Sequence, residues 1–482
     1  MRSSGRGEVK HELIALTSKK SRGFYIGGLI CFLVLACGLF FVIPDDECRI
    51  PIEILYIIVN LYILYASKKI FNTLCNGLII FLFSVFIFNG IRIVFDLFGV
   101  DNMRELYSPF TTATITEYNN NRTILNVILC SICVSIGYLR YRSKNVKEKN
   151  TVRLPNPLLW FLFVIGFAAK IYVAYISFTF IMLLSYSEVF TDGIAVNAYL
   201  RGLSYLPVFV CLIKLKERKK IWILPMAIWA LLHMATGQRG PGLLLLIFLF
   251  YYSIKLELVK LSLTKVGIAA LVGIFLSIMV GNIRSGEDEL TTSTENPVQD
   301  FLWQEGSSII VLQTSIQDCK KLDYHFVDIF SNVTSIFFHY FPFLKSKKDS
   351  DDHMTNQVIN YKYWSAYISY KTDPNIYFAG GGMGGNYIGQ VYVVGREYLV
   401  IIVSILVGMF LVVLENKLLY GSIIMSYIAF SVFQSIIYIP RDNLLDFITD
   451  LMPVAIMLLL FLIITFAYMV FFRANINLKK LF

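Results

Sequence analysis

The feature that most restricts the possible folds of this chain is a series of long, uninterrupted apolar segments. A helix needs roughly 20 apolar residues to cross about 30 Å of hydrocarbon. Segments of that kind lie at about 24–43, 50–66, 74–95, 123–142, 157–184, 198–215, 221–236, 239–254, 266–282, 397–414, 420–439 and 451–471. The composition agrees, since 56% of the residues are hydrophobic and only 16% are charged. We therefore predict an all-α polytopic integral membrane protein with about twelve transmembrane helices.

The distribution of charge gives an independent test of this topology. Basic residues gather in every second loop, whereas the alternate loops, such as Asp45–Glu47, are acidic or nearly neutral. The positive-inside rule then predicts that both termini are cytoplasmic. It also accounts for the net charge of +10 without a nucleic-acid partner. The first apolar segment has no small-residue cleavage site, so we predict a retained span and not a signal peptide.

One outer segment is far longer than the other loops. It divides the chain into a nine-span bundle at 1–282, a periplasmic loop at 283–396 and a three-span bundle at 397–482. Long loops in compact proteins are usually functional. Two sets of apolar residues keep helical spacing within it: Ile309, Leu312 and Ile316, and Phe326, Ile329, Phe330, Val333 and Phe337. We expect two amphipathic helices that lie on the membrane surface or cap a cavity.

The cysteines and histidines do not predict a metal centre or a cofactor. Six of the eight cysteines fall in apolar segments. Cys130 and Cys133 form a C-x-x-C in the middle of a span, without nearby Cys or His partners. We interpret this pair as small-residue packing and expect no disulfide framework and no bound metal.

Six arginines at the outer ends of predicted spans require an explanation, because arginine there does not serve orientation. These residues are Arg92, Arg201, Arg239, Arg284, Arg396 and Arg441. An arginine placed within the apolar slab costs about 2.5–3.5 kcal/mol on insertion scales. Its planar guanidinium group suits bidentate binding of phosphate oxygens. We predict a pyrophosphate-binding clamp at headgroup depth; the alternative for each residue is a snorkelling contact to lipid phosphate.

Two short outer turns are the strongest anion-binding candidates. The turn at 236–242 reads Thr-Gly-Gln-Arg-Gly-Pro-Gly and places Gln238 and Arg239 together. Its glycines permit close backbone approach, and Pro241 suits the first turn of the following helix. The second turn, Pro-Arg-Asp-Asn at 440–443, presents Arg441 in the same way.

Lys170 lies deep in the fifth predicted span, and we see no acidic residue at comparable depth. It is either neutral and packed, or it faces a water-filled cavity and meets the negative charge of a ligand. The glycine-rich run 380–385 leads into the tenth span. It brings Asn386, Tyr387 and Gln390 to the outer side, where their side chains suit hydrogen bonds to a sugar. The alternative is that the glycines only make a flexible lead to the helix.

A general base has to come from the loop histidines or the loop acids. The histidine candidates are His325, His339 and His353. Among the acids, Glu305 follows a Trp-Gln pair, a pairing common in sugar sites and equally suited to interfacial anchoring. We name Glu305 and His339 as candidates for this role.

Several of these motifs together resemble the bacterial O-antigen polysaccharide polymerases. The resemblance rests on the Gly-Gln-Arg-Gly-Pro turn, Gly281–Arg284, the long outer loop, the run Asn386–Gln390 and Pro440–Asn443. It covers most of the chain from about residue 200 onward. The implied reaction is glycosyl transfer between two undecaprenyl-pyrophosphate-linked oligosaccharides at the periplasmic face of the inner membrane. A lipid pyrophosphate is already a good leaving group, so no metal is required.

The resemblance also implies roles for the residues named above. Arg239, Arg284, Glu305 and His339 are the expected catalytic residues. The expected substrate-binding residues are Lys170, Arg201, Gln238, Asn386, Tyr387, Gln390, Arg396 and Arg441. The expected partners are the lipid-linked donor and acceptor, membrane lipid and, from the resemblance alone, a chain-length regulator protein.

Three other functions compete with this interpretation. O-antigen ligases share the layout but transfer the glycan to lipid A core. A flippase or exporter of lipid-linked oligosaccharide would need charges along a path through the membrane, whereas here only Lys170 lies deep. Glycosyltransferases that use lipid-phosphate sugars carry paired acids in their first outer loop. Asp45 and Asp46 fit that position, but their loop is short and we interpret them as solvated charges.

Overall fold

The structure is a computed structural model, and it describes most of the chain. The described residues are 5–42, 48–103, 114–141, 154–183, 198–234, 239–260, 297–331, 353–449 and 451–472, with isolated positions 262, 273, 275 and 333. The ninth predicted span, 266–282, therefore lies almost entirely outside the described residues. The same holds for Gln238, Arg284 and His339, and for the side chains of Arg239 and His353.

Eight helices among the described residues are long and apolar enough to cross a bilayer. They are Arg22–Val42 of α1 (Gly5–Val42), α2 (Arg49–Phe71), the continuous α3 (Gly77–Val85), η1 (Phe86–Gly90) and α4 (Ile91–Leu97), α5 (Glu117–Arg140), α6 (Asn156–Leu183), α19 (Tyr387–Tyr420), α20 (Ile423–Tyr438) with η7 (Ile439–Arg441), and α21 (Asp446–Thr449) with α22 (Leu451–Phe472). The predicted class, an all-helical multi-pass membrane protein, is confirmed, whereas the count of about twelve spans stays a prediction.

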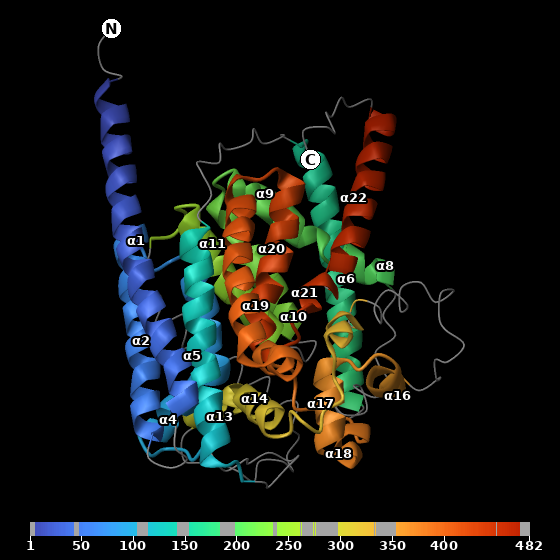
Figure 1. Ribbon diagram of the computed structural model, residues 1–482. Helices are drawn as coiled ribbons and strands as arrows, with labels where there is room; N and C mark the ends of the chain where they lie inside the picture. The colour runs from blue at the N-terminus through green and yellow to red at the C-terminus, as the bar shows by residue number, and fades with distance from the viewer. Residues whose placement is uncertain are drawn as a thin grey trace.

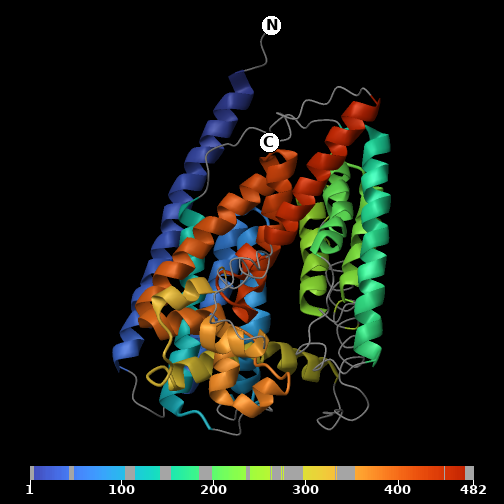
Figure 2. The same ribbon diagram turned by 90° about the vertical axis from the view of Figure 1, so that its right-hand side faces the viewer.

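The predicted sixth, seventh and eighth spans are shorter helices. They correspond to α8 (Ala198–Leu203) with α9 (Leu206–Lys216), η2 (Lys220–Trp222) with α10 (Ile223–Met234), and α11 (Arg239–Lys255). In Figure 2 the yellow-green helices α10 and α11 end well above the lower end of the blue-green helix α6. The loop-side ends of α10 and α11 therefore lie short of the loop-side end of α6.

Helix α5 forms the centre of the bundle, and glycine allows its closest contact. A Cβ on Gly137 would lie 2.1 Å from the carbonyl oxygen of Ile405, and one on Gly408 would lie 2.0 Å from that of Val134. Helices α5 and α19 can approach this closely because both residues lack a side chain. Cys130 and Cys133 are fully buried in α5, and both are free thiols.

The described part of the loop 283–396 folds into short helices at one end of the bundle (Figure 1). These are α13 (Pro297–Gly306), α14 (Ser308–Gln317), η4 (Phe326–Phe330), α16 (His353–Thr355), η6 (Asn356–Asn360), α17 (Trp364–Thr372) and α18 (Pro374–Phe378). Helix α1 begins and α22 ends at the opposite end of the bundle (Figure 1). We refer to the end that carries the loop helices as the loop side.

One of the two amphipathic segments expected in the loop is helical, but it is more deeply packed than a surface helix. Ile309, Leu312 and Ile316 lie in α14 and are buried, and so are the polar residues of α14 such as Gln313. Gln313 donates hydrogen bonds to the carbonyl of Met103 and to Asn120 of α5. The second segment begins as the 3-10 helix η4, and most of its remainder lies outside the described residues.

Candidate active site

Two of the sequence-predicted residues, Arg441 and Glu305, meet on the loop side. Helix α20 ends at Tyr438, and Pro440 turns the chain so that Arg441 points back toward α13. The Arg441 guanidinium forms an ion pair with the carboxylate of Glu305. It also lies 5.5 Å from the centre of the Phe88 ring. Three segments that are far apart in the sequence therefore build one charged centre.

The second half of the Gly-Gln-Arg-Gly motif, at the start of α11, lies beside this centre. A Cβ on Gly240 would lie 2.7 Å from the hydroxyl of Tyr438, so the start of α11 packs directly against the end of α20. The Tyr438 ring meets the Phe88 ring edge-on at 5.5 Å. Since α11 begins at Arg239, the backbone of this residue is next to Tyr438. The start of α11 and the Pro-Arg-Asp-Asn turn are thus neighbours.

The glycine-rich run also packs onto the Pro-Arg-Asp-Asn turn. A Cβ on Gly385 would lie 2.8 Å from the carbonyl carbon of Asp442, and Gly384 has a φ of +77°. Both positions need glycine, the first for space and the second for its backbone conformation. The run therefore has a packing role at the site in addition to leading into α19.

The predicted sugar-binding residues at the start of α19 are buried and hydrogen-bonded within the protein. Asn386 caps α19 and donates to Asn89 Oδ1 at 2.6 Å and to the carbonyl of Ser308 at 3.0 Å. The Tyr387 hydroxyl lies 2.8 Å from Cys130 Sγ. In this arrangement their polar atoms face protein groups, and they hold α19 against η1, α14 and α5.

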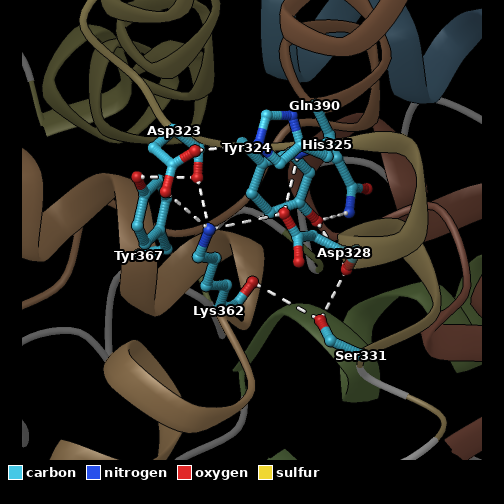
Figure 3. Close-up of polar contacts among 8 residues, drawn as sticks. All are labelled: Asp323, Tyr324, His325, Asp328, Ser331, Lys362, Tyr367 and Gln390. Atoms are coloured by element: carbon cyan, nitrogen blue, oxygen red, sulfur yellow. Dashed lines mark hydrogen bonds and ion pairs between the residues drawn. The ribbon is translucent and has the colours of Figure 1, made fainter.

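Gln390 connects the outer loop to the Arg441 turn. Its amide nitrogen donates to the Tyr324 hydroxyl at 2.7 Å, and its amide oxygen accepts from the Leu444 backbone N–H at 2.9 Å. The Tyr324 hydroxyl in turn donates to the carbonyl of Asp328 at 3.0 Å. Figure 3 shows the loop end of this chain of hydrogen bonds. Gln390 is fully buried, so both ends of its amide are used for positioning.

A charged cluster fixes the same loop segment at its exposed side (Figure 3). The Lys362 ammonium lies 3.0 Å from one carboxylate oxygen of Asp323 and 3.7 Å from that of Asp328. The hydrogen bond and charge of Lys362 lower the pKa of Asp323. His325, one of the candidate bases, is exposed, and its ring nitrogen lies 2.8 Å from Asp323.

A second arginine, Arg92, lies against Trp303 of α13, and Trp303 is two residues before Glu305 in the sequence. Arg92 is fully buried, its Nε lies 2.6 Å from Asp101 Oδ2, and its guanidinium lies 5.2 Å from the Trp303 ring centre. In the described part of the chain its two terminal nitrogens have no hydrogen-bond partner. Buried arginine nitrogens are normally paired, so this position is suited to an anionic group.

The sequence analysis missed two buried acids near the loop-side ends of α2 and α4. Glu53 and Asp96 are both buried, and Arg49 Nε lies 3.6 Å from the first and 3.7 Å from the second. The signal was present in the sequence, since Glu53 lies inside the apolar segment 50–66. An ionisable residue within a membrane span is a functional candidate by default.

Lys170 and Arg201 belong to a separate cluster that includes a histidine we had not considered. Lys170 is 2% exposed, and its ammonium lies 3.0 Å from His233 Nδ1 and 4.4 Å from the Trp229 ring centre. The charge of Arg201 acts on both Lys170 and His233. Arg396 lies elsewhere, at a kink in α19, with its Nη1 3.3 Å from the Tyr392 hydroxyl of the same helix.

The fold and the site define a multi-pass membrane protein with an arginine–carboxylate centre where its loop helices meet the bundle. Comparison with known families makes the class specific. The profile of the O-antigen polysaccharide polymerase Wzy family matches residues 24–473, nearly the whole chain. The chain therefore belongs to this family, whose members polymerise lipid-linked O-antigen repeat units in the membrane. No curated protein and no solved structure matches the chain.

Proposed function

We propose that this protein joins undecaprenyl-pyrophosphate-linked oligosaccharide repeat units at the periplasmic face of a bacterial inner membrane. The growing glycan leaves its lipid pyrophosphate and forms a glycosidic bond to a hydroxyl of one new repeat unit. The observation that carries the proposal is the Arg441–Glu305 pair, beside which α11 begins. This centre combines groups for binding a phosphate and for accepting a proton.

The chemistry follows from an exchange of partners at Arg441. Without substrate, the Arg441 guanidinium is paired with Glu305. When a pyrophosphate binds, Arg441 turns to the phosphate oxygens, and Glu305 becomes free to take the proton of the acceptor hydroxyl. The bond from the donor sugar to the pyrophosphate oxygen breaks, and the bond to the acceptor oxygen forms. Arg441, with Arg239 and Arg284, stabilises the negative charge on the leaving pyrophosphate.

Other residues support this reaction by position. Asn386, Tyr387 and Gln390 hold α19 and the outer loop in place next to Arg441, and the loop helices keep water, a competing acceptor, from the donor. Lys170, Arg201, Gln238 and Arg396 are proposed contacts to the substrates. His339 remains an alternative base, and a chain-length regulator remains a proposed partner.

The experiment that tests the function is polysaccharide length on a gel, for a deletion strain and for the same strain carrying the wild-type gene. If the protein is the polymerase, deletion leaves lipid A core with a single repeat unit, and complementation restores long chains. If no repeat unit reaches the core, the protein is a ligase or a flippase. Arg239→Ala and Arg284→Ala should abolish polymer while the protein still inserts; full-length polymer would remove that residue from the site.

A further inference from the structure

In the part of the chain that the structure describes, a buried lysine inside the membrane domain has no acidic partner. Lys170 lies in the middle of α6, where its ammonium contacts a histidine nitrogen and an aromatic ring. Across the described ranges no salt bridge joins it to a carboxylate, and Arg201 adds a further positive charge nearby. An uncompensated charge in a span is costly and marks a functional site by default. A group of this kind is suited to an anion.

The cluster lies near the point where α10 ends and α11 begins. Lys170 is thirteen residues before Leu183, the end of α6, which corresponds to about 20 Å of helix. His233 is the last residue but one of α10, and α11 begins six residues later at Arg239. A Cβ on Gly242 would lie 2.2 Å from the Met234 side chain, so α10 and α11 cross closely just below their turn.

The chain also connects the cluster to the Arg441 centre. Gly240 packs against Tyr438, three residues before Arg441. His233 and Arg239 lie on opposite arms of the same turn. The Lys170 cluster and the Arg441 centre therefore lie at neighbouring helix ends, that of α10 for the cluster and those of α11 and α20 for the centre. Next to Lys170 along α6, Ile171, Tyr172 and Tyr175 are exposed, which suits a hydrocarbon chain lying along the helix.

We propose that Lys170, His233 and Arg201 form a binding site for a phosphate group carried on a polyprenyl chain. Lysine and arginine supply charged donors, and His233 supplies a ring N–H once Lys170 turns from its Nδ1 to the phosphate. The lipid-linked phosphate is held within the membrane domain, deeper in the bundle than the loop helices. The proposal rests on the proposed function and deepens it, because it assigns a binding site to the phosphate of the lipid carrier. Binding at this site can be measured without turnover.

The test is a native mass spectrometry titration of the full-length protein in detergent with farnesyl phosphate. Wild-type protein is expected to bind it, and Lys170→Met is expected to weaken one binding event by about tenfold or more. Arg201→Gln, at an exposed position, should weaken the same event and guards against a folding defect in Lys170→Met. Lys69→Met, at an exposed lysine near the end of α2, is the matched control and should bind as wild type does.

Two further ligands decide the chemistry. Inorganic phosphate and phosphatidylglycerol should not compete at the same concentration; equal competition by either overturns a site for polyprenyl phosphate. Unchanged affinity in both Lys170→Met and Arg201→Gln overturns the assignment of residues. The result is separable from the proposed polymerase activity, because a strain test that excludes polymerase function would leave Lys170-dependent binding intact.

Discussion

Two of the buried ionisable side chains in the membrane domain, Glu415 and Lys170, differ in whether the described protein groups pair their charge. Glu415, in α19, accepts hydrogen bonds from the hydroxyls of Tyr138 and Tyr251 and lies 2.9 Å from the Lys255 ammonium. Lys170 has His233 and Trp229 and, in the part of the chain that the structure describes, no carboxylate. A buried charge is stable when the protein satisfies it and costly when it does not. The difference indicates that Glu415 stabilises the packing of three helices, whereas Lys170 is suited to the ligand-binding role that we propose for it.

The largest effect should come from removing the satisfied charge. Glu415→Leu removes the carboxylate that pairs with Lys255 and that accepts hydrogen bonds from two buried tyrosine hydroxyls. We expect a loss of about 3 kcal/mol in the free energy of unfolding, the low end of the range for a broken buried pair, because Lys255 is partly exposed. The measurement is denaturant unfolding in detergent. The double variant with Lys255→Met should lose less than Glu415→Leu alone, and a wild-type transition in Glu415→Leu would contradict a structural role.

Much of the fold could be predicted because membrane spans have a simple physical signature. Length and hydropathy predicted the helices that became α1 to α6 and α19 to α22, since a bilayer leaves no other way to satisfy backbone groups. The same criterion of length and hydropathy also left one residue out. The predicted tenth span ended at 414, one residue before Glu415. Glu53 and Glu415 are both buried in helices long enough to span a bilayer, but each lies near an end of its helix, so the expectation that no acid lies as deep as Lys170 stays a prediction.

The site could be predicted only in part, because pairing between distant segments leaves no local pattern. The Pro-Arg-Asp-Asn and Gly-Gln-Arg-Gly turns were recognisable from their composition. That Arg441 meets Glu305 depends on how α13 packs against η1, which no spacing in the sequence specifies. His233 was missed because it lies in an apolar run and has no motif, and its role depends on contact with Lys170 on another helix.

A second ion pair, Arg441–Glu305, should behave unlike Glu415 when activity is measured. Arg441→Gln should reduce polymer formation by about 10²-fold or more, since one donor to a developing oxyanion is worth that much. Arg122→Gln is the matched control, because Arg122 also pairs with a carboxylate, that of Glu397, between α5 and α19. Its polymer length should stay near wild type. Equal losses in both variants would mean that Arg441 has only a structural role.

Gln390 should give a smaller effect that acts through Arg441. Gln390→Met leaves the Leu444 N–H and the Tyr324 hydroxyl without this partner in the core. We expect a loss of about 1–3 kcal/mol in stability and a fall in the maximal polymerisation rate at saturating substrate. Tyr324→Phe removes only the loop end of the chain of hydrogen bonds and should lose less on both measures. If Tyr324→Phe is the more damaging variant, the loop and not the Arg441 turn is the part that Gln390 positions.

Lys170→Met should change stability far less than Glu415→Leu does, and this is the most direct test of the comparison. Methionine retains the packing of the lysine stem and removes a charge that lacks a carboxylate. The lost contact with Trp229 and the relieved burial of charge oppose each other, so we expect a change within about 1 kcal/mol. Unfolding of Lys170→Met beside Glu415→Leu under identical conditions measures it. A loss as large as that of Glu415→Leu would show that Lys170 also fastens helices.

The smallest effect concerns Lys362, a lysine that has the carboxylates Lys170 lacks and is outside the spans. Its hydrogen bond lowers the pKa of Asp323, so the folded carboxyl binds its proton less readily than the unfolded one. The resulting stabilisation is present above the unfolded Asp pKa of about 3.9 and is lost as the pH falls through the lower folded value. Hydrogen exchange of segment 323–331, corrected for intrinsic rates, should therefore be constant near neutral pH and rise below about pH 4.

The variant Lys362→Met should raise exchange of this segment at neutral pH and remove the rise below about pH 4. Lys321→Met, which breaks the neighbouring pair with Asp318, should leave both features unchanged. If the rise in exchange below about pH 4 persists in Lys362→Met, another carboxyl group causes it. The loop would then say nothing about the difference between paired and unpaired lysines.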